Sequence, residues 1–177
     1  MADSLVEAIE GSGFPAWLAE GRGGRPLLSH HRFRASVSGC PNACSQPQIH
    51  DVGVIGRAPV AVAADLCQGC GECLLACRED AISTEGRLQI RVGRCLGCGD
   101  CVRACPTGAL SLAAGGCRVL AGGKLGRHPS LGQEVLACGA TDAVAALLAR
   151  FLGVLQSHGR PGERLGEVLA RSAGQSG

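Results

Sequence analysis

Apolar and polar residues alternate along two stretches in the first third of the chain, as they do in half-buried β-strands. The stretches are residues 33–38 and residues 49–56, and the second ends in glycine. Between them, Gly39 and Pro41 indicate a turn that leads from a strand into a helix. We therefore expect two strands in this region, joined by a turn and a helical segment.

Farther along, the apolar residues recur with the spacing of an amphipathic helix. Residues 141–156 place them on one stripe, with Thr141 as the N-cap. The stripe consists of Val144, Leu147, Leu148, Phe151, Leu152 and Leu155. The start of the chain is acidic and amphipathic, unlike a secretory signal, and no apolar run approaches the roughly 18 residues of a membrane helix. We therefore expect a cytoplasmic protein with no membrane span.

Composition adds a chemical expectation. The chain has 177 residues, 12 of them cysteine and 28 glycine, and a hydrophobic share of 46% that is normal for a folded domain. In a reducing compartment this many cysteines indicate metal rather than disulfides. The formal net charge of +2 is too small to indicate a nucleic-acid or membrane-surface partner.

Most of the cysteines form an internal repeat. Two runs read C-x2-C-x2-C-x3-C in the near-identical frames CQGCGECLLACREDAI and CLGCGDCVRACPTGAL. Zinc is one interpretation, because C-x2-C pairs also form tetrahedral zinc sites. Zinc sites commonly use two pairs separated by a longer loop, however, which leaves the third and fourth cysteines of each run without a role. The repeat therefore favours iron–sulfur clusters.

Residues 64–112 resemble a complete bacterial ferredoxin module with two [4Fe–4S] clusters. In that module three cysteines of a run bind one cluster and the fourth reaches the other. The resemblance implies that cluster one is held by Cys67, Cys70, Cys73 and Cys105. It implies that cluster two is held by Cys95, Cys98, Cys101 and Cys77.

A third pair, Cys40 and Cys44, has spacing C-x3-C. Four residues apart, they lie on one face of a helix, and they either hold one edge of a metal site or are simply buried. Their context is more specific. The segments VSGCPNAC and HDVGVIG, then CRVLAGGKLGRHP at 117–129 and the segment 160–169, resemble the sirohaem sulfite and nitrite reductases. The match is closest to anaerobic and dissimilatory-type sulfite reductase subunits, which carry an inserted ferredoxin module.

The resemblance implies an α+β fold in which a sirohaem-reductase half-domain is interrupted by the ferredoxin module, with two short hairpins and two short helices. The expected parts are an N-terminal helix and linker (1–29), the first part of the half-domain (30–63), the ferredoxin module (64–112), the second part of the half-domain (113–171) and a tail (172–177).

The resemblance also implies a site. In the family, sirohaem is coupled to a further [4Fe–4S] cluster through a shared cysteine, and by position Cys40 and Cys44 form half of that cluster's ligands, with Cys44 as the bridge. Lys124 and Arg127 then face the sirohaem carboxylates or the anionic substrate, sulfite or nitrite. Arg32 and Arg34 are further candidates to bind the cofactor. For each of these basic residues, a solvated surface charge is the alternative.

The other half of that ligand set, a C-x5-C pair, is missing, because no cysteine precedes Cys40. Three explanations compete: the true start lies upstream, a partner subunit supplies the pair, or the sirohaem site is lost. Cys117 and Cys138 are conceivable replacements, but neither has a partner at metal spacing, which favours cysteines with a purely structural role.

These patterns favour an iron–sulfur protein that passes electrons through two [4Fe–4S] clusters to a sirohaem centre, together with a redox partner protein or a second reductase subunit. Reduction of the anion itself requires the missing cysteine pair, supplied upstream or by that partner. The alternatives are a stand-alone ferredoxin-like carrier on a degenerate reductase remnant, and a cluster-bearing assembly subunit that docks a partner.

Overall fold

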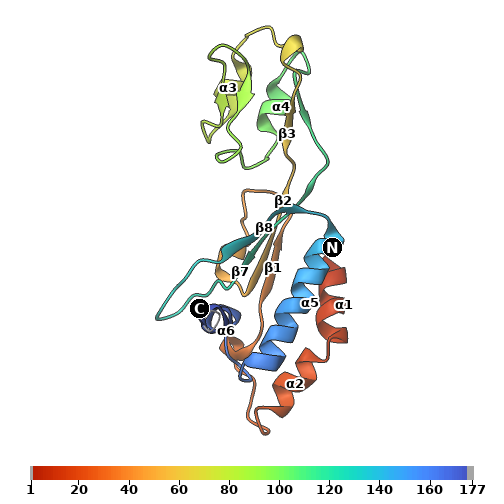
Figure 1. The fold of residues 1–177 in the computed structure, drawn as a ribbon, viewed down its shortest axis with the longest axis vertical. Coiled ribbons are helices and arrows are strands. Elements are labelled where there is room, and N and C mark those ends of the chain that lie inside the picture. Colours follow the sequence, from red (N-terminus) through yellow and green to blue (C-terminus); the bar gives the residue numbers. More distant parts are fainter. Residues whose placement is uncertain (1, 175–177) are drawn as a thin grey trace. The chain divides into compact units, whose positions relative to one another are not determined.

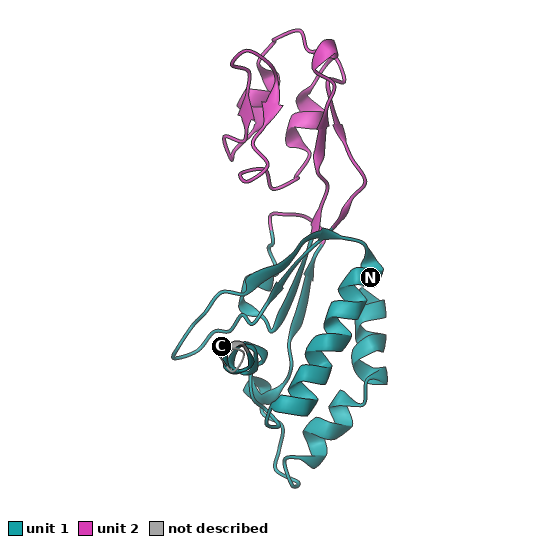
Figure 2. Ribbon diagram, viewed as in Figure 1, with its two compact units in different colours: residues 1–38, 43–55, 117–177 teal, residues 39–42, 56–116 magenta. Residues whose placement is uncertain are grey.

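The computed structural model describes residues 2–174, which form an α+β fold divided into two compact units (Figure 2). Unit 1 consists of residues 2–38, 43–55 and 117–174 of the described chain. Unit 2 consists of residues 39–42 and 56–116. Along residues 2–174, no helix combines the length and the apolar character that crossing a bilayer requires.

Unit 1 is built on a mixed sheet of four strands in the order β1-β2-β7-β8. The strands are β1 (Ala35–Ser38), β2 (Val52–Arg57), β7 (Gly116–Ala121) and β8 (Gln133–Gly139). β1 and β2 are parallel, whereas β7 and β8 are antiparallel. The two strands expected from the alternation are thus present, each shorter than its stretch. β2 is central and buried along most of its length, with Val52 and Val54 among the least exposed residues of the unit.

Four helices complete unit 1. They are α1 (Ala2–Gly11), α2 (Phe14–Glu20), α5 (Thr141–His158) and α6 (Leu165–Gly174). α1 and α5 pack side by side (Figure 1). The predicted stripe of α5 is confirmed, since all its members except the partly buried Leu147 are buried in the core of unit 1. The predicted N-cap is wrong by one residue: Ala140 has the extended N-cap conformation, and Thr141 is already the first residue of the helix.

The helix expected after Gly39 does not form. The segment 39–46 consists of bends and turns, followed by the 3-10 turn η2 (Pro47–Ile49). Ser45 explains the difference, because its hydroxyl bonds the hydroxyls of Ser36 (2.9 Å) and Ser38 (2.6 Å) and so ties the loop back to β1. Ala43 and Gln46 both have φ of 52°, a left-handed conformation that a helix excludes.

Unit 2 contains two short helices, α3 (Glu72–Ala76) and α4 (Asp100–Ala104), as expected. β4 (Ile82–Ser83) and β5 (Gln89–Ile90) form one hairpin. The second antiparallel pair is not a hairpin, because β3 (Val60–Val62) pairs with β6 (Leu110–Leu112) from the far end of the unit. This pairing extends the compact unit beyond residues 64–112. Two further 3-10 turns are η1 (Ser29–His31), which belongs to unit 1, and η3 (Ala64–Leu66), which belongs to unit 2.

Candidate metal centre

The two cysteine runs have the same local structure in unit 2. Each begins as an irregular loop and ends in a five-residue helix, α3 or α4. The N-cap of each helix is a glycine in the left-handed conformation, Gly71 with φ 81° and Gly99 with φ 80°. A side chain at either position would be strained, which explains why the C-x2-C-G motif recurs in both runs.

The fold brings together thiols from both runs. Cys73 and Cys101 are buried, 8% and 7% exposed, and belong to the small apolar core of unit 2. Burial raises the pKa of the Cys73 thiol, and the neighbouring Cys67 and Cys105 raise it further. Cys105 comes from the other run. Its effect on the pKa of Cys73 places it within electrostatic range of a thiol that is expected to bind cluster one.

The second group has the complementary composition. Burial raises the pKa of Cys101 to about 11, and Cys95, Cys98 and Cys77 add to the effect. Cys77 is the last cysteine of the first run. Each group thus contains the fourth cysteine of the other run, which is the arrangement that crossed ligation needs.

Hydrogen bonds reach the sulfurs of both crossing cysteines. The backbone N–H of Ala81 donates to Cys77 Sγ over 3.3 Å. Cys105 Sγ lies 3.7 Å from the Thr107 hydroxyl, and this side-chain hydrogen bond, together with nearby backbone N–H groups, lowers the pKa of Cys105 to about 7. Donors of this kind stabilise a thiolate, the form in which cysteine binds metal.

A cavity of about 380 Å³ lies beside the second group, within unit 2. Its lining includes Cys77, Cys95, Cys98 and Cys101, together with Cys40. Among residues 2–174, no three His, Cys, Asp or Glu side chains converge on one point where a single metal ion could bind. A cubane differs from a single ion, because each of its four irons takes one thiolate, so its ligands surround a cluster-sized space. The soft thiol donors, the glycine-bearing loops and the cavity fit such a cluster.

Cys40 and Cys44 are both exposed and lie in the loop between β1 and η2. Because the loop is not helical, the expectation that they share a helical face is wrong. Cys40 belongs to unit 2, where it lines the cavity, and Cys44 belongs to unit 1.

The basic candidates in unit 1 differ in their surroundings. Lys124 Nζ forms an ion pair with Glu167 Oε1 at 2.7 Å. The side chains of Arg32, Arg34 and Arg127 are exposed. The glycine before Lys124 has a structural role, since a Cβ on Gly123 would lie 2.3 Å from the Gln48 carbonyl oxygen. The chain's own backbone therefore packs closely against Gly123.

Sequence reasoning missed a buried carboxylate in unit 1. Asp51 is 1% exposed and accepts hydrogen bonds from Arg34 N (3.0 Å), Arg164 Nε (2.8 Å) and Leu165 N (3.1 Å). Arg164 also donates to the Gly123 carbonyl over 3.1 Å. The carboxylate thereby ties the start of β2 to α6 and to the Lys124 loop. The sequence signal that could have identified Asp51 is an acidic residue directly before a buried strand.

Cys117 and Cys138 lie on β7 and β8. Burial raises the pKa of Cys117, and the nearby Cys138 adds to the effect. Cys138 is exposed, whereas Cys117 is 5% exposed and belongs to the core of unit 1.

Comparison with protein families decides the relationship of the chain. Residues 20–174 match the model of the family described as "Nitrite and sulphite reductase 4Fe-4S domain". The chain belongs to this family. It is therefore an iron–sulfur protein related to the sulfite reductases, as the sequence motifs indicated.

Individual curated proteins are similar to shorter parts of the chain. The coenzyme F420-dependent sulfite reductase of Methanocaldococcus jannaschii is 41% identical over 56 residues, which is 32% of this chain and 9% of the relative. One subunit of the anaerobic sulfite reductase of Salmonella typhimurium is 40% identical over 66 residues, which is 37% of this chain and 19% of the relative. The matched part is thus less than a fifth of either curated relative.

A solved structure shares the fold. The crystal structure of dissimilatory sulfite reductase I superposes with a TM-score of 0.57 at 21% sequence identity. The match covers 81% of this chain and 41% of that one. The likeness supports the α+β fold expected for the chain.

Proposed function

We propose that the chain is an electron-transfer component of a sirohaem-type sulfite or nitrite reductase. The observation that carries the proposal is the grouping of thiols in unit 2, where each group includes the fourth cysteine of the other run. The two [4Fe–4S] clusters, when bound, supply one-electron storage and transfer.

The ligand sets follow the two groups. Cys67, Cys70, Cys73 and Cys105 hold cluster one, and Cys95, Cys98, Cys101 and Cys77 hold cluster two. Burial raises the pKa of the Cys73 and Cys101 thiols, and each thiol loses its proton when it binds iron as a thiolate, so assembly of the clusters releases protons.

The second part of the proposal concerns the loop that carries Cys40 and Cys44. Cys40 and Cys44 provide half of the ligands of a sirohaem-coupled cluster, with Cys44 as the bridge. A second segment of chain, upstream or on a partner subunit, supplies the other pair. Lys124 and Arg127, with Arg32 and Arg34, supply positive charge for the sirohaem carboxylates or for a sulfite or nitrite anion. Support comes from Cys40, which lines the same cavity as the cluster-two cysteines.

A carrier without a reductase site is the second candidate. One observation favours it: Lys124 is already paired with Glu167, and Gly123 packs against the chain's own backbone. In this case unit 1 is a structural remnant, and unit 2 alone exchanges electrons with partners.

Anaerobic purification with and without the neighbouring gene products separates these candidates. The proposal predicts about eight iron atoms per chain from unit 2, together with a sirohaem Soret band when the partner is present. Cys44→Ala is expected to remove the coupling between haem and cluster in the electron paramagnetic resonance (EPR) spectrum, whereas Cys138→Ala leaves it unchanged.

Each outcome has a distinct meaning. Two clusters without any porphyrin, even with the partner present, support the carrier. A chain that binds no iron contradicts both candidates.

A further inference from the structure

The two cluster loops are near-identical in sequence but differ in what packs against them. Gly69 and Gly97 occupy the same place in the two CxGCG motifs, and both have positive φ, 70° and 72°. A Cβ on Gly69 would meet no heavy atom within 4 Å. A Cβ on Gly97 would lie 2.7 Å from the Ala58 carbonyl oxygen and 2.8 Å from Arg57 Cγ. Only the second of these two loops is packed against the end of β2.

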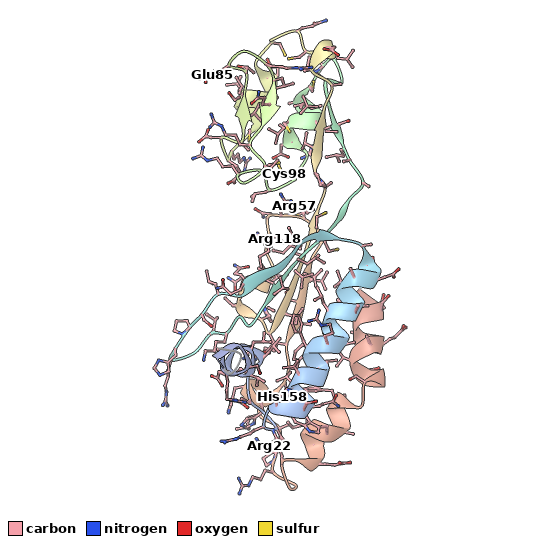
Figure 3. The ribbon with its side chains drawn as sticks, in the orientation of Figure 1. Arg22, Arg57, Glu85, Cys98, Arg118 and His158 are labelled. Atoms are coloured by element: carbon pink, nitrogen blue, oxygen red, sulfur yellow. The ribbon has the colours of Figure 1, made fainter. Side chains whose placement is uncertain are left out.

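Arg57 makes direct contact with this second loop. Its Nη2 donates a hydrogen bond to the Cys95 carbonyl oxygen over 2.9 Å. The neighbouring Ala58 N–H donates to the Gly97 carbonyl over 3.2 Å. Arg57 and Cys98 lie toward the same end of unit 2 (Figure 3). These bonds fix the backbone that presents Cys95 and Cys98.

The arginine also brings charge. A guanidinium stays protonated at every accessible pH, and its bond to a carbonyl leaves that positive charge in place. The charged residues that line the nearby cavity are Arg78, Glu79, Asp100 and Arg103, two of each sign. Arg103 and Asp100 form an ion pair with each other. Arg57 thus places a positive charge at the backbone that presents Cys95.

We propose that Arg57 is a positioning and tuning residue for cluster two that raises its reduction potential. This inference rests on the proposed function. Reduction adds one negative charge to a cluster, and a fixed cation nearby stabilises the reduced form. A higher potential favours electrons on the cluster whose cavity Cys40 lines, which is the direction that delivery to the Cys40–Cys44 loop requires.

The test is an EPR-monitored redox titration of the full-length chain with dithionite as reductant. Cys70→Ser and Cys98→Ser, each altering one cluster, assign the two signals. Arg57→Gln keeps an N–H donor but removes the charge, and we expect at least a tenfold loss in the reduction equilibrium of cluster two, about 59 mV toward negative potential. Arg57→Lys restores the charge and is expected to recover most of the shift.

Arg87→Gln is the matched control. Arg87 is an exposed arginine of unit 2 whose charge already faces Asp65 at 3.6 Å, so its removal is expected to leave both potentials unchanged. The iron content of each variant is measured in parallel, as a readout that does not depend on potential.

The outcomes separate the inference from the proposed function. If the wild-type chain binds no clusters, the proposed function fails. If both clusters assemble but Arg57→Gln shifts cluster two no more than Arg87→Gln does, the inference is wrong and the proposed function stands. If Arg57→Gln loses cluster two, then Arg57→Lys decides: cluster two retained at the wild-type potential supports the inference, and a lowered potential or a lost cluster overturns it.

Discussion

The buried carboxylate of Asp51 gives the sharpest stability prediction. Its Oδ1 accepts from Arg164 Nε and Leu165 N, and its Oδ2 accepts from Arg34 N. In Asp51→Asn one oxygen becomes an NH2 group, so at least one donor faces another donor. An unpaired buried N–H costs about 1.5 kcal/mol, and loss of the negative charge weakens the remaining bonds by a similar amount. We therefore expect a loss of about 3 kcal/mol, a large share of the ~5–15 kcal/mol of a typical domain.

The assay is urea unfolding followed by the fluorescence of Trp17, the single tryptophan of the chain, which packs against the core of unit 1. Glu134→Gln is the matched control, since Glu134 pairs with Arg118 where the two side chains are 41% and 36% exposed. Such pairs contribute less than about 1 kcal/mol. A loss in Asp51→Asn no greater than in the control would refute the reasoning.

Three further predictions concern other parts of the chain. Gly97→Ala is expected to halve the iron content, because the added Cβ would lie 2.7 Å from the Ala58 carbonyl oxygen. The control is Gly93→Ala, since a Cβ on Gly93 would have open space around it. Equal iron content in the two variants would contradict this explanation. Arg171 lowers the pKa of Glu163 below its usual 4.5, so the stability that this ion pair contributes is present above pH 4.5 and is lost as the pH falls through the lowered pKa. Glu163→Gln is expected to make the free energy of unfolding depend less on pH in that window. An unchanged pH dependence would contradict a stabilising role of the pair. Leu148→Ala, at a position 1% exposed, is expected to cost about 2–5 kcal/mol in the Trp17 assay, and a cost below 1 kcal/mol would place the side chain outside the core.

The sequence predicted the elements whose signals are local. The stripe of α5 repeats with the helical period, so its buried face was recognisable without knowledge of the fold. The cysteine runs carry their ligand spacing in the chain itself. Both signals depend only on residues a few positions apart, so contacts with distant parts of the chain do not alter them.

The misinterpreted parts depend on distant or competing contacts. The spacing of Cys40 and Cys44 fits a helix, but the Ser45 hydroxyl bonds back to β1 and the backbone turns instead. Asp51 meets Arg164 across more than half of the chain, and no local pattern reports such a pair. The difference between the two cluster loops was equally hidden, because it arises from Arg57, which lies outside the repeated sequence.

The two ends of the longer segment of unit 2 bear on how the sheet of unit 1 forms. β2 and β7 are neighbours in the sheet, and the longer segment of unit 2 leaves one and enters the other. A Cβ on Gly115 would lie 3.6 Å from the Arg57 carbonyl oxygen, so the exit and the return of the chain lie side by side. The sheet of unit 1 can therefore close around the two ends of this segment whatever conformation the rest of the segment adopts.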